Sequence, residues 1–124
     1  MILMKDAGIN LQLLHDDLLR SIEFDSSDPQ ERRLTVVLES AETGARMRIV
    51  ARGVYLFRCT ARGHARGSES INAWDEGVSP ATAAELAGDR AAGYGVPASA
   101  FTVTFHSGSH FELVCDRLEF EYLS

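Results

Sequence analysis

Cysteine is scarce in this sequence, since Cys59 and Cys115 are the only two among 124 residues. Two cysteines are too few to make a disulfide scaffold, and their separation is not that of a metal-binding knuckle. Apolar runs are also short, and none approaches the ~18 residues that a membrane-spanning helix needs. The apolar start MILM is followed almost at once by Asp6, so it lacks the long apolar stretch of a signal peptide. We therefore expect a reduced, cytoplasmic protein.

Positive charge is limited too. Lys5 is the only lysine, and acidic residues outnumber basic ones by 18 to 12, which gives a formal net charge of −6. Nucleic acids and membrane surfaces are anionic, so this charge disfavours both as non-specific partners. The sequence has three prolines and shows no internal repeat or low-complexity tract. Residues 1–124 are therefore expected to form a single domain.

The sequence does contain a series of alternating apolar and polar residues, which is the pattern of β-strands. The alternation is clearest in residues 45–66, where every arginine occupies an even position and the odd positions are mostly apolar as far as Cys59. This segment is predicted to be one long strand, or two strands joined at Gly53. Its polar side would be an arginine face that includes Arg46, Arg48, Arg52 and Arg58.

Alternation also predicts strands at 21–25 and 32–40 and three more within 99–123. The first two of those three would be joined by a two-residue hairpin turn at Gly108–Ser109. The stretch 62–98 is the least regular part of the chain.

Two short helices are expected beside these strands. Residues 79–93 have Ser79 as a suitable N-cap and Pro80 at the first helical position, and residues 9–21 have apolar residues at helical spacing. The predicted fold is a β-rich α+β domain, with about six or seven antiparallel strands forming a curled sheet or sandwich and two short helices.

The segment His15-Asp16-Asp17 is the first candidate site. An HD pair is the core of one class of metal phosphohydrolases, but that site takes further ligands from other helices. The simpler interpretation is that these short polar side chains cap or end a helix. His106 and His110 flank a predicted hairpin and could add a ligand, although two solvent-facing hairpin histidines are the simpler interpretation.

The arginine face has two interpretations. It could bind an anionic partner, or its arginines could pair with glutamates on neighbouring strands, as is ordinary on sheet surfaces. The candidate glutamates are Glu23, Glu39, Glu112, Glu119 and Glu121. Cys59 and Cys115 fall at inward positions of strands, where cysteines are usually inert.

Acidic residues also surround the only tryptophan, since Asp75 and Glu76 follow Trp74 directly. An exposed tryptophan with acidic neighbours would be a good anchor for a basic protein partner. The alternative is that Trp74 belongs to the core.

Three stretches of the chain resemble a broad group of small bacterial proteins: LHDDLLRSIEFD, VARGVYLF and FTVTFHSGSHFELVCDRLEFEYL. Some members of this group resemble immunity proteins of polymorphic or contact-dependent toxin systems. The apolar positions that match are Leu14, Leu18, Ile22, Val54, Phe105, Leu113 and Leu118. The resemblance implies a β-rich fold without catalysis of its own and a toxin as partner, and it does not extend to residues 62–98.

The leading hypothesis is therefore a non-enzymatic protein-binding module, an immunity protein that binds and blocks a basic toxin domain, with no metal or cofactor. The expected contact residues are Asp16, Asp17, Trp74, Asp75 and Glu76. One alternative is a small metal-dependent hydrolase that uses His15, Asp16 and either His106 or His110. Another is a β-domain that binds an anionic ligand through the arginine face. The oligomeric state stays open.

Overall fold

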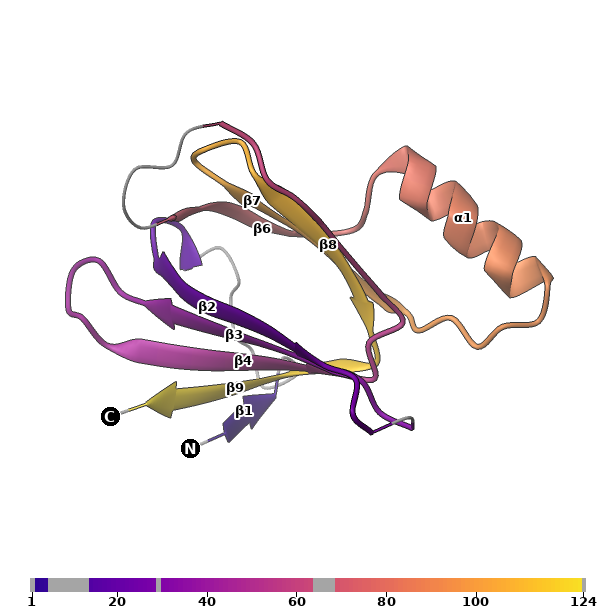
Figure 1. The fold of residues 1–124 in the computed structure, drawn as a ribbon, viewed down its shortest axis with the longest axis horizontal. Coiled ribbons are helices and arrows are strands. Elements are labelled where there is room, and N and C mark those ends of the chain that lie inside the picture. Colours follow the sequence, from indigo (N-terminus) through magenta and orange to yellow (C-terminus); the bar gives the residue numbers. More distant parts are fainter. Residues whose placement is uncertain (1, 5–13, 29, 64–68, 124) are drawn as a thin grey trace.

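The computed structural model describes residues 2–4, 14–28, 30–63 and 69–123. These residues form two antiparallel sheets and one helix (Figure 1). In spatial order, the strands of the first sheet are β1 (Ile2–Met4), β9 (Arg117–Leu123), β4 (Arg46–Arg52), β3 (Arg33–Glu39) and β2 (Leu18–Asp25). Those of the second sheet are β5 (Leu56–Thr60), β8 (His110–Cys115), β7 (Ser99–Phe105) and β6 (Ile71–Glu76).

The predicted β-rich, antiparallel α+β character is confirmed, but the strand count is not. The described residues form nine strands, of which β1 has three residues, so the expectation of six or seven was too low. The sheets also stay open at their edges. β6 was missed because the register of β6 against β7 shifts between Ile71 and Ala73, and this irregularity breaks the alternation of its side chains.

The buried face of each sheet follows the alternation of its strands, and the two faces together form the core. The first sheet contributes residues such as Leu34, Ile49 and Phe120, which are at most 1% exposed. The second contributes a cluster of aromatic rings, in which Trp74 and Phe111 lie 6.0 Å apart between ring centroids. In Figure 1 the sheets converge where β4 continues into β5 and diverge toward the opposite end.

The corner between the sheets is formed by Gly53, which has a φ of 64°. The backbone N–H of Asp116 donates to the carbonyl oxygens of Arg52 and Gly53 and so ties the corner to the β8–β9 connection. For residues 45–66, the prediction of two strands joined at Gly53 is therefore correct, and the prediction of one long strand is wrong. The two strands belong to different sheets, which divides the predicted arginine face.

Three further predictions need correction. Cys59 lies on the inward side of β5, opposite the core residue Phe111, but it is exposed rather than buried because β5 is an edge strand. The hairpin turn has three residues rather than two, since Phe105 and Ser109 form the last backbone hydrogen bond before the turn, and Gly108 has a φ of 93°. Residues 18–21, the end of the helix predicted at 9–21, lie in β2. The prediction was wrong because leucines fit both helical and strand periodicity.

Of the rest of that predicted helix, residues 9–13 lie outside the described residues, and residues 14–16 form a single turn that begins at Leu14. The second predicted helix is confirmed as α1 (Pro80–Ala91), with Ser79 as its N-cap. Figure 1 shows that α1 lies beyond the second sheet, on the side away from the first sheet. Among the described residues, no helix is long and apolar enough to cross a membrane.

Candidate functional site

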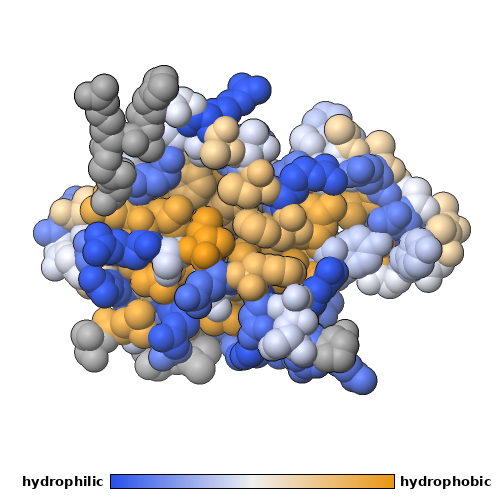
Figure 2. All heavy atoms as spheres, in the orientation of Figure 1, coloured by the Kyte–Doolittle hydropathy of each residue, from blue (hydrophilic) through white to orange (hydrophobic). Residues whose placement is uncertain are grey.

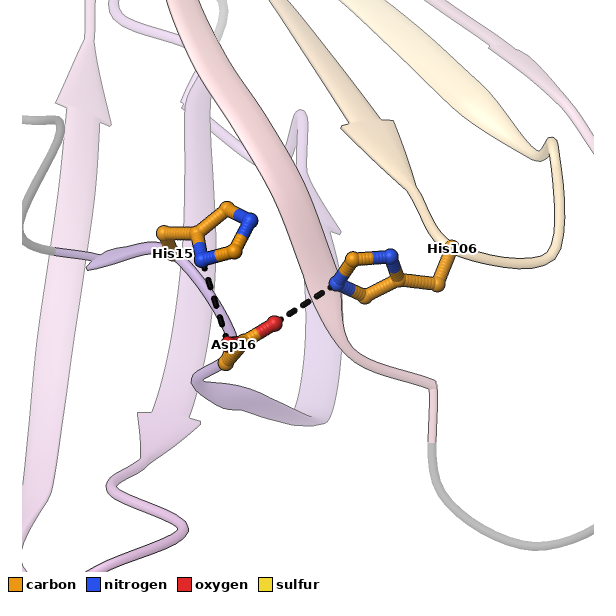
Figure 3. Close-up of side chains that lie close together, drawn as sticks. All are labelled: His15, Asp16 and His106. Carbon is orange, nitrogen blue, oxygen red and sulfur yellow. Dashed lines mark hydrogen bonds and ion pairs between the residues drawn. The ribbon is translucent and has the colours of Figure 1, made fainter.

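His15, Asp16 and His106 come together although 90 residues separate Asp16 from His106. Asp16 Oδ1 lies 2.7 Å from His106 Nε2, and Asp16 Oδ2 lies 3.1 Å from His15 Nδ1 (Figure 3). The two imidazole rings meet edge to face, with centroids 5.5 Å apart. All three side chains are about half exposed, at 51%, 63% and 44% for His15, Asp16 and His106. The cluster is therefore open to solvent.

The backbone holds this cluster in place through one short segment, Ser70–Ile71. The N–H of Asp16 donates to the Ile71 carbonyl at 2.7 Å, and the N–H of His106 donates to the Ser70 carbonyl at 3.0 Å. Asp16 also has a φ of 69°, the only positive φ at a described residue other than glycine. Aspartate tolerates this conformation better than most residues do. Both halves of the cluster are thus positioned before any ligand arrives.

Asp17 follows the cluster and begins the entry of the chain into β2. Its N–H and carbonyl both form backbone hydrogen bonds, to Leu14 and Ile71 respectively. Partial burial raises the pKa of its carboxyl, and the negative charges of Asp16 and Glu42 raise it further. Asp16 and Asp17 therefore differ, since Asp16 contacts two histidines, whereas the charges that affect Asp17 are those of Asp16 and Glu42.

Trp74 is 1% exposed and packs against Phe101 and Phe111, so the core interpretation of this residue is the correct one. Its side chain is not available as a surface anchor. Asp75 and Glu76 are exposed at the far end of β6 and line a surface groove of about 440 Å³. At ~3.3 Å per residue along a strand, Asp75 lies roughly 13 Å from Ile71, so the predicted acidic contacts form two separate groups.

His110 lies in the groove with Asp75 and Glu76 rather than with His106. It pairs with Thr104 and Thr60 across the second sheet, whereas His106 belongs to the hairpin turn. Of the two histidines named as candidate partners for Asp16, the structure thus brings His106 to it.

The arginines pair with acidic side chains, as the second interpretation of the arginine face states. Arg46, Arg48 and Arg52 on β4 contact Glu39, Glu121 and Glu119 at 3.1, 3.1 and 2.8 Å. The hydrogen bond from Arg52 is the main cause that lowers the pKa of Glu119. Arg58, in the other sheet, contacts Glu85 of α1 at 2.9 Å. The arginine face is therefore a set of cross-strand and sheet–helix ion pairs.

Glu112 is a nearly buried carboxylate, 6% exposed, on the outer side of the second sheet. It accepts hydrogen bonds from the Ser79 N–H and the Thr82 hydroxyl, both at 2.8 Å. Burial opposes its ionisation, but these hydrogen bonds and the charge of Arg58 outweigh burial and lower its pKa. Glu112 thus anchors the start of α1 to the sheet.

One apolar surface feature was not predicted from the sequence. Two edge strands, β2 and β5, carry apolar side chains that are partly or fully exposed. We call this set the β2–β5 seam; it consists of Ile22 and Phe24 on β2 and Phe57 and Cys59 on β5. The Phe24 and Phe57 rings stack with centroids 6.3 Å apart, and Phe24 is 47% exposed. Figure 2 shows apolar residues across the middle of this face, over the space between the ribbons of β2 and β5.

No family model matches the chain, and the comparisons with curated proteins and with solved structures give no match either. The resemblance to immunity proteins therefore stays a prediction.

Proposed function

We propose that this chain is a protein-binding module of the immunity type, which binds a basic toxin domain and blocks it. The observation that carries the proposal is the β2–β5 seam, where Phe24 is 47% exposed and stacks on Phe57. An exposed aromatic ring that stacks on a partly buried one, beside further apolar side chains, is characteristic of an interaction surface. Aromatic side chains of this kind supply much of the binding free energy in protein interfaces.

The backbone around the seam supports the same function. Among the described strands, β2 after its bulge has β3 as its one neighbour, and β5 has β8. Such edges present unpaired N–H and C=O groups to which a strand of another protein can be added. A partner segment that pairs with one edge would also cover the apolar side chains of the seam.

Charge determines the kind of partner that we propose. Residues 14–31, which include all of β2, contain six acidic side chains and one arginine. Asp16 and Asp17 lie before β2, and Asp25 and Asp28 lie at its far end. An acidic border around an apolar centre fits a basic protein, whose association it accelerates. Asp16 and Asp17 thus stay in the proposed contact surface, while Trp74 does not.

The test is recovery of the tagged protein from its own cells, followed by native mass spectrometry. We expect a one-to-one complex with a basic protein whose toxic activity the purified chain inhibits stoichiometrically. Phe24→Asp should abolish recovery of the partner, because it places a charge in the seam. Tyr94→Asp is the matched control, since Tyr94 is an exposed aromatic residue (64%) beyond α1. A partner that Phe24→Asp retains as well as Tyr94→Asp does would contradict the proposed surface.

A metal-dependent hydrolase is the second candidate, and the proximity of His15, Asp16 and His106 favours it. Its test is hydrolysis of an activated phosphate ester by the zinc-loaded protein. Turnover that His106→Ala abolishes would support this candidate, and zinc-loaded protein without turnover would remove it.

A further inference from the structure

We infer that His15, Asp16 and His106 form a binding site for a single divalent transition-metal ion of the zinc type. This metal site does not depend on the proposed protein-binding function. The hydrolase candidate, in contrast, requires the metal site. The sequence alone left the ligand set of the HD pair incomplete, because it could not show whether His106 or His110 lies near it. The fold supplies that ligand by bringing His106 from the β7–β8 turn to Asp16.

The ligand atoms are close enough for one ion. One nitrogen from each histidine and one carboxylate oxygen all lie within 4.8 Å of one another. In a tetrahedral zinc site with bonds of about 2.0–2.1 Å, neighbouring ligand atoms are about 3.3 Å apart. Asp16 contacts His106 Nε2 through Oδ1 at 2.7 Å and His15 Nδ1 through Oδ2 at 3.1 Å, so a nitrogen of each histidine already faces the same carboxylate. Binding one ion would require side-chain rotations that bring the three ligand atoms from within 4.8 Å of one another to about 3.3 Å apart.

The backbone supports the side chains at both ends of the site. Asp16 keeps its unusual φ of 69° through the hydrogen bond to Ile71, and His106 is held to Ser70. A residue held in a sparsely populated conformation is often found where a side chain must be aimed. The three ligands therefore need no backbone rearrangement to bind an ion.

The donor set selects the class of ion. Two imidazole nitrogens and one carboxylate oxygen suit zinc and its neighbours in the first transition row, whereas magnesium and calcium prefer oxygen ligands. Three protein ligands leave at least one coordination position, which the solvent-exposed location would fill with water. The site thus has the composition of an open metal centre rather than of a closed structural one.

Calorimetric titration of tag-free, chelator-treated protein with zinc chloride tests the inference. We expect one equivalent of zinc to bind, and the visible spectrum of bound Co²⁺ to report the nitrogen ligands. His15→Ala, His106→Ala and Asp16→Asn should each weaken binding by at least the ~10–100-fold that loss of a supporting residue costs. Asp16→Asn is chosen because asparagine also tolerates a positive φ.

His110→Ala is the matched control, because His110 lies four residues from His106 but outside the cluster. It should bind zinc as the wild type does. Thermal unfolding without metal must show that all the variants fold. Absence of saturable binding by the wild type would overturn the inference and leave a hydrogen-bonded surface cluster. Unchanged affinity in His106→Ala, or lost affinity in His110→Ala, would overturn it as well.

Discussion

At the residue scale, Glu112 is the polar side chain on which the structure depends most clearly. It is 6% exposed and accepts hydrogen bonds from Ser79 and Thr82. Glu112→Gln keeps the shape of the side chain but replaces one acceptor oxygen with a donor. We expect the free energy of unfolding to fall by about 1–3 kcal/mol, the cost of leaving buried groups without partners. Chemical denaturation would measure it.

Glu85→Gln is the control for that change, since Glu85 is an exposed acid (56%) paired with Arg58. Its effect should be at most ~1 kcal/mol, as for other exposed ion pairs.

Because the folded state lowers the pKa of Glu112, the stabilising contribution of Glu112 is present above the ordinary glutamate pKa of about 4.3. The contribution is lost as the pH falls through the lower pKa of the folded state. The wild type and Glu112→Gln should therefore differ less in stability under strong acid than at neutral pH, and a constant difference would contradict this assignment.

Gly53 supplies the second prediction at this scale. Its φ of 64° costs a residue with a side chain roughly 1–2 kcal/mol, and a Cβ here would overlap the carboxylate of Asp116. Gly44 has a similar φ of 74°, but among the described atoms none lies within 4 Å of the corresponding Cβ position. Gly53→Ala should therefore destabilise the protein by about 1–3 kcal/mol more than Gly44→Ala, the usual cost of overpacking. Equal losses in thermal or chemical unfolding would show that the corner adapts without cost.

At the scale of the element, the edge position of β5 makes a prediction about thiol chemistry. Cys59 is exposed and Cys115 is 0% exposed. Iodoacetamide should label Cys59 in the native protein and Cys115 after denaturation, because a buried thiol is inaccessible. Peptide mapping by mass spectrometry would distinguish the two. When a binding partner has been identified, its binding should protect Cys59 from labelling. Continued labelling of Cys59 in the complex would place the interface elsewhere.

The strands with regular alternation could be predicted from the sequence. β3 and β9 have their buried residues at every second position, and β4, which pairs with both of them, also buries alternate residues. Irregular elements were missed for an identifiable reason. The register shift in β6 places Ile71 and Trp74 inward although three positions separate them, which resembles helical spacing.

The candidate site was predictable only in part. The sequence identified His15 and Asp16 as possible ligands, but it could not show whether His106 or His110 would reach them. That choice depends on the three-residue turn, which removes His106 from the strand, and on its hydrogen bond to Ser70. The seam was beyond prediction because alternation identifies which side of a strand is apolar, but not whether the strand lies at an edge.

At the scale of the whole molecule, the net charge of −6 should act on the rate of partner binding. Raising the ionic strength from ~10 mM to ~150 mM shortens the range of electrostatic attraction from about 30 to 8 Å. We expect the association rate with a basic partner to fall by roughly tenfold or more over that range. Stopped-flow measurement would test this expectation.

In the same experiment, Phe24→Ala should change a different rate from the one that added salt changes. It removes a contact of the docked complex but no charge, so it should raise the dissociation rate and leave the association rate almost unchanged. An association rate that is insensitive to salt would argue against a basic partner.

The anchoring of α1 by Glu112 has a consequence for the order of folding. The first turn of α1 contains no acidic residue of its own, and its cap Ser79 is held by a carboxylate from β8. Glu112 takes its place only when β8 lies between β5 and β7. An isolated helix of 12 residues is marginal in water, so α1, although its hydrogen bonds are local, should form late. We therefore expect the second sheet to assemble first and to act as the template on which the helix then forms.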